Sequence, residues 1–282
     1  MNSIHLGENA DPGNNLRLLA LTSCCVDYYP QLNQSFMGGN SLNQAAMWKK
    51  IEPEARVSVI SCLGNNERGK MIKDFFIKMG IDHSRVYFRP GKTASNQLRV
   101  DQHGERFGIE GAWDGGVYES FLLSDDDWEW VAQQHIVAMP ANNPNFDEMI
   151  RRKHSDQILS VDYLDVENRI DLEETLAFTD LAFVAAAPDQ VAYLRDLAFH
   201  KDKLLVVTLG AAGSHVFLDN KSWHQPALPV PEVVDTTGCG DAYQAAFALT
   251  WWRTNNIDKA MYAGALAASE ILQAWGGVGK IL

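Results

Sequence analysis

The sequence predicts an α/β fold with a mostly parallel central sheet, because short runs of β-branched and aliphatic residues alternate with amphipathic stretches. The length of 282 residues suffices for one large domain with a substantial core. A hydrophobic content of 46% with 21% charged residues is typical of a soluble globular protein. No repeat, low-complexity tract or long linker divides the chain into separate folding units.

Most of the expected elements have ordinary start and stop signals. Strands are expected at Leu16–Thr22, Val57–Leu63, His135–Met139, Ile158–Tyr163, Leu181–Ala185 and Leu204–Leu209, with a late hairpin strand at Ser214–Leu218. Helices are expected at Glu67–Met79, Asp125–Gln134, Asp189–His200, Ala242–Trp252 and Asp258–Ala274. Gly80 ends the first of these helices and Ser124 caps the second.

One region departs from this alternation of strands and helices. Thr93–Asp101 and Glu105–Ile109 alternate apolar and polar residues around His103 and Gly104, which predicts a β-hairpin. The early segment Asp27–Phe36 is expected to add further short strands. A small β lid over a cleft is therefore predicted, with lid segments around residues 27–40 and 93–112.

Charge and cysteine content exclude several classes of protein. The net charge of −12 argues against nucleic acid or an anionic membrane as a partner, since both bind basic patches. No apolar run approaches membrane-spanning length. The polar segment 1–15 lacks a signal-peptide pattern and predicts a flexible tail before a domain over residues 16–282. Reduced thiols in the cytoplasm are expected for the four cysteines, which are Cys24, Cys25, Cys62 and Cys239.

The strongest chemical signal is the run Asp235-Thr236-Thr237-Gly238-Cys239-Gly240-Asp241, which precedes a stretch of helix formers. The glycines stand where the helix begins, so backbone N–H groups there point outward and favour an anion. A carboxylate beside such an anion hole can take the proton of a hydroxyl that attacks a phosphoryl group. The alternative is that Asp235 and Asp241 only cap the helix, because Asp is common at helix N-termini.

The whole run resembles the C-terminal signature of the ribokinase-like (PfkB) sugar kinases, Asp-Thr-x-Gly-x-Gly-Asp, with Cys239 where Ala is usual. Asp27 follows the first strand, where that family places a sugar-binding Asp. Gly38-Gly39-Asn40-Ser41-Leu42-Asn43 resembles its N-terminal Gly-Gly-x-x-x-Asn signature, and Thr208–Gly213 resembles its Thr-x-Gly-x-x-Gly nucleotide loop. Each motif is weak alone, but their order and separation extend the resemblance over nearly the whole chain.

This resemblance implies a three-layer α/β/α ribokinase-like fold with a small β lid, and an ATP-dependent phosphotransferase acting on a primary hydroxyl of a small sugar derivative. Asp241 would be the general base, and backbone N–H groups of Gly238, Cys239 and Gly240 would stabilise the transferring phosphoryl group. Asp27, Gly38, Gly39 and Asn43 would hold the sugar, and Thr208, Gly210, Gly213, Thr236, Gly238 and Gly240 would line the ATP site. The implied cofactors are ATP and Mg²⁺, and a monovalent cation such as K⁺ is left open.

One departure from the family pattern concerns the residues associated with the metal ion. The family commonly has an Asn-x-x-Glu motif near residue 190, associated with magnesium and phosphate. Here the corresponding stretch is Ala185-Ala186-Ala187-Pro188-Asp189-Gln190, which alters both positions. Asp189 is the one candidate metal ligand that remains in it.

The substrate is less defined than the reaction. Cys25–Asn33, followed by Gly38-Gly39-Asn40, resembles the opening of the fructosamine kinase branch, which phosphorylates the 6-hydroxyl of a sugar–amine adduct. Gln97, Arg99 and Arg106 of the lid are candidate substrate ligands. The arginines suit an acidic adduct such as fructose-aspartate or fructose-asparagine, whereas lid carboxylates such as Glu105 would suit the ammonium of fructoselysine. Solvated surface charges are the alternative to both.

Two other functions remain open at this point. One is a different sugar or nucleoside kinase with the same machinery, and the other is a sugar- or nucleotide-binding protein that has lost catalysis. The resemblance also leads us to expect a homodimer through the lid. Gly64–Met71 nearly meets the P-loop pattern, but Met71 replaces the magnesium-binding hydroxyl and Glu67 would repel a phosphate, so a turn is the better interpretation.

Overall fold

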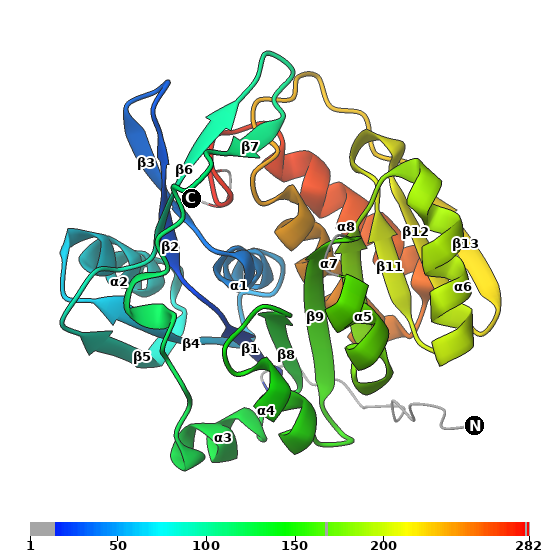
Figure 1. Ribbon diagram of the computed structural model, residues 1–282, viewed down its shortest axis with the longest axis horizontal. Helices are drawn as coiled ribbons and strands as arrows, with labels where there is room; N and C mark the ends of the chain where they lie inside the picture. The colour runs from blue at the N-terminus through cyan, green and yellow to red at the C-terminus, as the bar shows by residue number, and fades with distance from the viewer. Residues whose placement is uncertain (1–14, 167–168, 280, 282) are drawn as a thin grey trace.

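A computed structural model describes residues 15–166, 169–279 and 281, so nearly all of the tail expected over residues 1–15 lies outside the described residues. The strands of its main sheet are β1 (Arg17–Leu21), β4 (Arg56–Gly64), β5 (Asp82–Arg89), β8 (Ile136–Pro140), β9 (Ile158–Asp165), β10 (Leu181–Ala185), β11 (Leu205–Thr208), β12 (Ser214–Leu218) and β13 (Lys221–Gln225). They form a nine-stranded sheet in the order β13-β12-β11-β10-β9-β8-β1-β4-β5 (Figure 1). Every pairing from β5 to β11 is parallel, whereas β12 and β13 are antiparallel additions at one edge.

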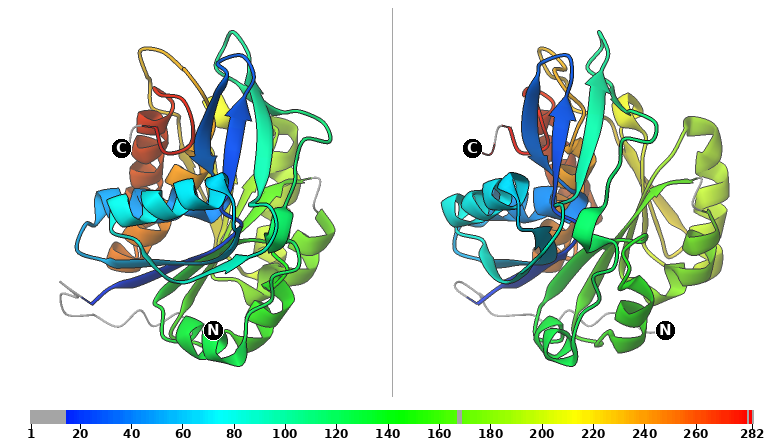
Figure 2. Two further views of the ribbon diagram at one scale, coloured as in Figure 1. Left: turned by 90° about the vertical axis from the view of Figure 1, so that its left-hand side faces the viewer. Right: turned by 60° about the vertical axis from the view of Figure 1, so that its left-hand side comes forward.

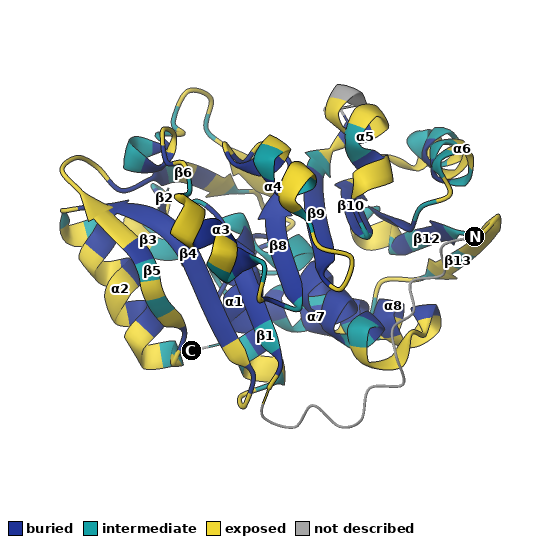
Figure 3. Ribbon diagram, turned by 90° about the horizontal axis from the view of Figure 1, so that it is seen from below, coloured by how far each residue is buried: buried dark blue, intermediate teal, exposed yellow. Residues whose placement is uncertain are grey.

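Helices cover both faces of this sheet. One face carries α1 (Asn40–Ile51), α2 (Glu67–Met79), α7 (Cys239–Thr254) and α8 (Ile257–Ile271), and the other carries α3 (Asp125–Val131), α4 (Phe146–Arg152), α5 (Arg169–Thr175) and α6 (Val191–Lys201). Alternate residues of β1 face the two layers, so Leu18 and Ala20 pack in one core while Leu19 and Leu21 pack in the other. The strands are accordingly buried between helices whose outer faces are exposed (Figure 3). The predicted three-layer α/β/α fold is confirmed.

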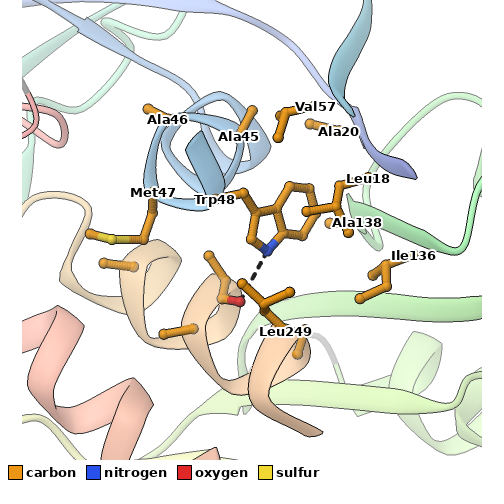
Figure 4. Packing of buried hydrophobic residues seen from close by; sticks show 14 of the residues in the cluster. Leu18, Ala20, Ala45, Ala46, Met47, Trp48, Val57, Ile136, Ala138 and Leu249 are labelled. Carbon is orange, nitrogen blue, oxygen red and sulfur yellow. Dashed lines mark hydrogen bonds between the residues drawn. The ribbon is translucent and has the colours of Figure 1, made fainter. Parts of the chain in front are cut away.

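The packing of α1 on α7 joins the N-terminal and C-terminal parts of the chain. Trp48 of α1 is fully buried, and its indole Nε1 donates a hydrogen bond to the Ala245 carbonyl of α7 at 3.0 Å (Figure 4). Helix α1 was not among the predicted helices, and it begins at Asn40, inside the Gly38–Asn43 signature. The polar residues of that signature therefore lie on a helix that is fixed by its own apolar face.

Four strands form a separate, smaller sheet, the lid sheet. They are β2 (Cys25–Tyr29), β3 (Gln34–Gly38), β6 (Ser95–Val100) and β7 (Arg106–Gly108), in the order β3-β2-β6-β7. β2 pairs antiparallel with β3 and parallel with β6, and β6 and β7 form the expected hairpin. The lid sheet stands above the main sheet in Figure 1, and Figure 2 shows the same arrangement from two other sides.

Several elements differ from expectation for local reasons. Helix α3 ends at Val131, three residues before its predicted end at Gln134. The side-chain Nε2 of Gln134 donates to the Trp130 carbonyl at 2.9 Å. Strands β5 and β13 are rich in polar and charged residues at the sheet edges, and the seven-residue helices α4 and α5 are too short to show a helical period. These four elements were not predicted.

Candidate active site

The candidate site lies where the carboxyl ends of the parallel strands meet the lid sheet and the start of α7. Asp162 stands near the end of β9, and Thr208 ends β11. The two flank β10 in the sheet, so both point to the same edge. Open α/β sheets bind ligands outside this edge. The functional side chains come from β2, α1, β9 and α7.

Asp27 lies on β2 and is 6% exposed. It packs against Gly38 of β3, where an added Cβ would come within 1.9 Å of Asp27 Oδ2, so a glycine is required there. The Cys25 thiol donates to Asp27 Oδ1 at 3.4 Å. Burial raises the pKa of Asp27 to about 6, opposed by the Cys25 hydrogen bond and the positive charge of Arg106. Asp27 is therefore a buried acceptor held against the lid backbone.

Asn40 and Asn43 lie on the first turn of α1, one turn apart, so their side chains share a face. Gly39 caps this helix with a φ of 113°. Asn40 Nδ2 donates to Asp241 Oδ1 at 2.9 Å, and Asn43 Nδ2 donates to Asp241 Oδ2 at 2.7 Å. The side-chain oxygen of Asn43, Oδ1, is buried and has no hydrogen-bond partner within the described chain. It packs against Gly277, where an added Cβ would come within 2.8 Å of this oxygen.

A second buried carboxylate, Asp162, was not predicted from the sequence. Asn40 Nδ2 donates to Asp162 Oδ2 as well as to Asp241, and the Leu164 amide donates to Asp162 Oδ1 at 2.9 Å. Gln44 Nε2 fixes the Asn40 amide by donating to its Oδ1 at 3.3 Å. Burial raises the pKa of Asp162. The only sequence signal was an Asp near the carboxyl end of a buried strand, an edge where ligands bind.

Asp241 lies in the first turn of α7, which has 16 residues and no side-chain cap at its N-terminus. Gly238 is the cap residue, with φ 78°, and a Cβ there would come within 2.5 Å of Gly277. The Ala242 amide donates to the Gly238 carbonyl at 2.9 Å, and the amides before it point out of the helix end. Burial, aided by the charge of Asp162, raises the pKa of Asp241 to about 8, against the opposing effects of Asn43 and Arg106. The arrangement places a buried carboxylate beside a helix N-terminus, a position that favours anions.

The residues before Asp241, Asp235–Gly240, form what we call the anion loop. Two of its members are placed differently from expectation. The Cys239 amide donates back to the Thr236 carbonyl at 3.3 Å, so it is already bonded within the loop. Thr236 Oγ1 accepts from the Arg106 amide at 2.9 Å, so this residue, expected to line the ATP site, is bonded to the lid.

The segment expected to bind the nucleotide, Thr208–Gly213, which we call the nucleotide loop, starts at the last residue of β11. Gly210 begins a 3-10 turn with φ 56°, and the Leu209 amide donates to the Gly213 carbonyl at 2.8 Å. No atom lies within 4 Å of a Cβ built at Gly210, so the loop presents open backbone there. Ser214 Oγ lies 2.9 Å from the Tyr243 hydroxyl of α7, which joins the end of this loop to the helix that carries Asp241.

Strand register corrects two predicted substrate ligands. Asp27 pairs with Asn96, whereas Gln97 pairs with Tyr28 and Arg99 pairs with Phe107. Because successive residues of a strand face opposite sides, Gln97 and Arg99 lie on the face of the lid sheet away from Asp27. Arg106 differs, because it pairs with Val100, which faces the same side as Asn96 and Asp27. From that face its charge opposes the rise in the pKa of both Asp27 and Asp241.

The structure gives Asp189 no partners for a metal ion. It lies in an exposed 3-10 turn, Pro188–Gln190, after β10. Within residues 15–166, 169–279 and 281, no group of three or more His, Cys, Asp or Glu side chains could hold a metal ion. The described residues therefore supply no dedicated cage for Mg²⁺.

The profile of the pfkB family carbohydrate kinases matches residues 25–280. This chain belongs to that family. It is similar to the fructoselysine 6-kinase of Escherichia coli K12, with 30% identity over 89% of this chain and 95% of the relative, and to that of Shigella flexneri, with 29% identity over the same shares. The ribokinase of Arabidopsis thaliana, solved with ribose and ATP, has 22% identity and a TM-score of 0.76 over 94% of this chain and 95% of that chain. The protein is an ATP-dependent carbohydrate kinase.

Proposed function

We propose that this kinase transfers the γ-phosphoryl group of ATP to the 6-hydroxyl of a fructosamine. The observation that carries the proposal is Asp241, held by Asn40 and Asn43 at the uncapped start of α7 and facing the lid residue Asp27. The fructoselysine 6-kinases, which match over nearly their whole length at about 30% identity, support the sugar–amine part.

The proposed reaction uses the two carboxylates in different ways. Asp27 accepts hydrogen bonds from sugar hydroxyls and sets the orientation of the sugar. Asp241 takes the proton of the attacking hydroxyl while its oxygen bonds to the γ-phosphorus and the bond to the ADP oxygen breaks. The amides of Gly240 and Asp241 stabilise the charge on the transferring group. The closed lid excludes water and so limits ATP hydrolysis.

ATP would bind along the nucleotide loop and reach the start of α7. Mg²⁺ would arrive bound to its phosphates, a mode that needs few protein ligands and neutralises charge as the phosphoryl group moves. A monovalent cation such as K⁺ stays a prediction of the family resemblance.

The position of Arg106 bears on the choice of adduct. Its charge acts on Asp241 and Cys239 of the anion site as well as on Asp27, so it suits developing phosphoryl charge. Arg99 lies on the other face of the lid sheet. We therefore propose that neither arginine is committed to an acidic group of the substrate, which favours a fructoselysine-type adduct over a fructose-aspartate type.

A coupled ADP-release assay across fructoselysine, glucoselysine, fructose-asparagine, fructose and ribose, with and without Mg²⁺, tests this proposal. We expect the highest kcat/KM with fructoselysine and only in the presence of Mg²⁺. Preferred turnover of ribose or fructose would instead assign the chain to the other sugar kinases of the family, and preference for the acidic adduct would overturn the role given to Arg106.

Two further expectations concern the setting of the enzyme. The outer face of the lid sheet, with Gln97, Arg99 and the 56%-exposed Phe107, is where we propose the contact of a homodimer, which light scattering would detect. All four cysteines are free, which fits a reducing compartment such as the cytoplasm. In the described part of the chain, no helix has the length and apolar character to cross a membrane.

A further inference from the structure

Tyr29, the last residue of β2, reaches from the lid sheet to the anion loop. Its side chain is fully buried, with its ring edge-on to Phe36 at 5.2 Å and to Trp275 at 5.7 Å between ring centroids. Its hydroxyl donates to Asp235 Oδ2 at 2.8 Å and lies 2.8 Å from Thr237 Oγ1, whose own hydroxyl can donate back. A buried phenol thus bonds two residues that lie more than 200 positions further along the chain.

Asp235 is the fixed point to which Tyr29 is bonded. It is fully buried, its Oδ1 accepts from the Thr237 amide at 2.8 Å, and its Oδ2 also accepts from the Gly276 amide at 2.9 Å. The carboxylate therefore orders the beginning of the anion loop through three donors. Two of them are backbone groups, and the third, Tyr29, is the only one that comes from the lid sheet.

The tip of the β6–β7 hairpin makes a second connection to the same loop. The Thr236 amide donates to the Gly104 carbonyl at 2.9 Å, and Thr236 Oγ1 accepts from the Arg106 amide at 2.9 Å. A Cβ added at Gly104 would come within 2.5 Å of Val233, so the hairpin is closely packed there. Three consecutive residues, 235–237, are thus each bonded to the lid sheet or its hairpin.

From this geometry we propose that Tyr29 is a positioning residue that couples the sugar-binding lid to the phosphate-binding anion loop. Tyr29 and Asp27 are two residues apart on β2, so they face the same side and move together. A sugar bound to Asp27 would fix the position of strand β2. The Tyr29 hydroxyl would then hold Asp235 and Thr237 in place. The backbone amides that follow Thr237 would thereby be positioned to bind the phosphoryl group. We call the hydrogen bonds of the Tyr29 hydroxyl to Asp235 and Thr237 the latch. The part of this coupling that involves the sugar rests on the proposed function, whereas the latch does not.

Hydrogen–deuterium exchange of the unliganded protein tests the latch without any substrate. Tyr29→Phe keeps the ring and removes only the hydroxyl. We expect exchange in residues 236–242 to become about 5- to 10-fold faster, as loss of one buried hydrogen bond allows. The matched control is Tyr28→Phe, which removes a hydroxyl that donates to Asn33 on the exposed face of the same strand. Equal exchange of the anion loop in both variants would overturn the latch.

A double-mutant cycle tests the coupling in the working enzyme. With fructoselysine as the probe, Tyr29→Phe should lower kcat about 10-fold, change the sugar KM by less than about twofold, and raise the ratio of sugar-independent ATP hydrolysis to transfer. Thr237→Val removes one partner of the Tyr29 hydroxyl. If the two residues act through this contact, the variant that carries both substitutions should lose no more kcat than the more impaired single variant. Losses that multiply, or a rise in sugar KM alone, would contradict the coupling.

The two tests separate failure of the latch from failure of the proposed function. If fructoselysine is not turned over, the exchange measurement still decides whether Tyr29 orders the anion loop. If the exchange is unchanged while fructoselysine is phosphorylated, the substrate assignment stands and Tyr29 is only a core residue.

Discussion

The lid sheet and the start of α7 each present a buried carboxylate, but the carboxylates have different proton affinities. Burial raises the pKa of both, to about 6 for Asp27 on the lid side and to about 8 for Asp241 on the helix side. Each carboxylate has a negative neighbour that raises its pKa, Asp235 for Asp27 and Asp162 for Asp241, and the charge of Arg106 opposes the rise in both. We propose that these similar groups divide two tasks. At neutral pH Asp27 remains a charged acceptor for hydroxyls, and Asp241 is matched to exchange a proton.

The largest expected effect comes from removing the base. Asp241→Asn should lower kcat by about 100-fold or more, because a positioned base contributes that much to proton transfer. The Asn side chain retains an oxygen that can accept from Asn40 or Asn43, so the fold should persist. Turnover by the coupled assay and far-UV circular dichroism would check both parts. Near-normal turnover would remove Asp241 from the mechanism.

The same substitution on the lid side should act on binding. Asp27→Asn weakens the charge-assisted hydrogen bonds to sugar hydroxyls and should raise the sugar KM by about 10- to 100-fold, with a smaller effect on the KM for ATP. Initial rates over a matrix of sugar and ATP concentrations would measure the split. A loss confined to kcat would mean that the two carboxylates do not divide the work as described.

The neighbours of Asp241 should move the pH profile in opposite directions. The acid limb of kcat/KM is expected near the pKa of about 8, since the base must be ionised to act. Asp162→Asn removes a negative neighbour and should shift this limb to lower pH, whereas Arg106→Gln removes a positive one and should shift it to higher pH. Profiles of the three proteins in one buffer series provide the measurement, and shifts of the same sign would refute this account.

The smallest expected effect is on stability. The pKa of Asp241 is about 8 in the folded state, against 3.8 for an ordinary Asp. Between pH 3.8 and about pH 8, Asp241 therefore keeps its proton in the folded state, whereas the unfolded chain has released it. The stability contributed by that proton is complete below about 3.8 and is lost as the pH rises toward 8. Asp241→Asn carries no such penalty, so its Tm should exceed that of the parent by about 5 °C at pH 8.5 and match it at pH 4. An equal difference at both values would exclude a proton-linked cause.

Contiguous motifs explain why two local features around the candidate site were predictable. The helix start at Gly238 and the lid hairpin around His103 each depend on residues close together in sequence, and both are present as expected. Asp162 and Tyr29 escaped prediction because their partners lie 122 and 206 positions away. Gln97 was predicted as a substrate ligand, but it lies on the face of the lid sheet away from Asp27. A shift of one residue in strand pairing moves a side chain to the other face, and the sequence alone does not determine that pairing.

The contact of Trp48 with Ala245 has a consequence for how the protein is made. A ribosome releases the N-terminal segments first, but Trp48, Asn43 and Tyr29 all find their partners in residues 235–245. Until that part of the chain emerges, β1 and α1 lack the cover of α7 and present apolar surface to the cell. A chain truncated before residue 235 should therefore be held by chaperones or aggregate, although it contains every strand of the lid sheet and of the main sheet.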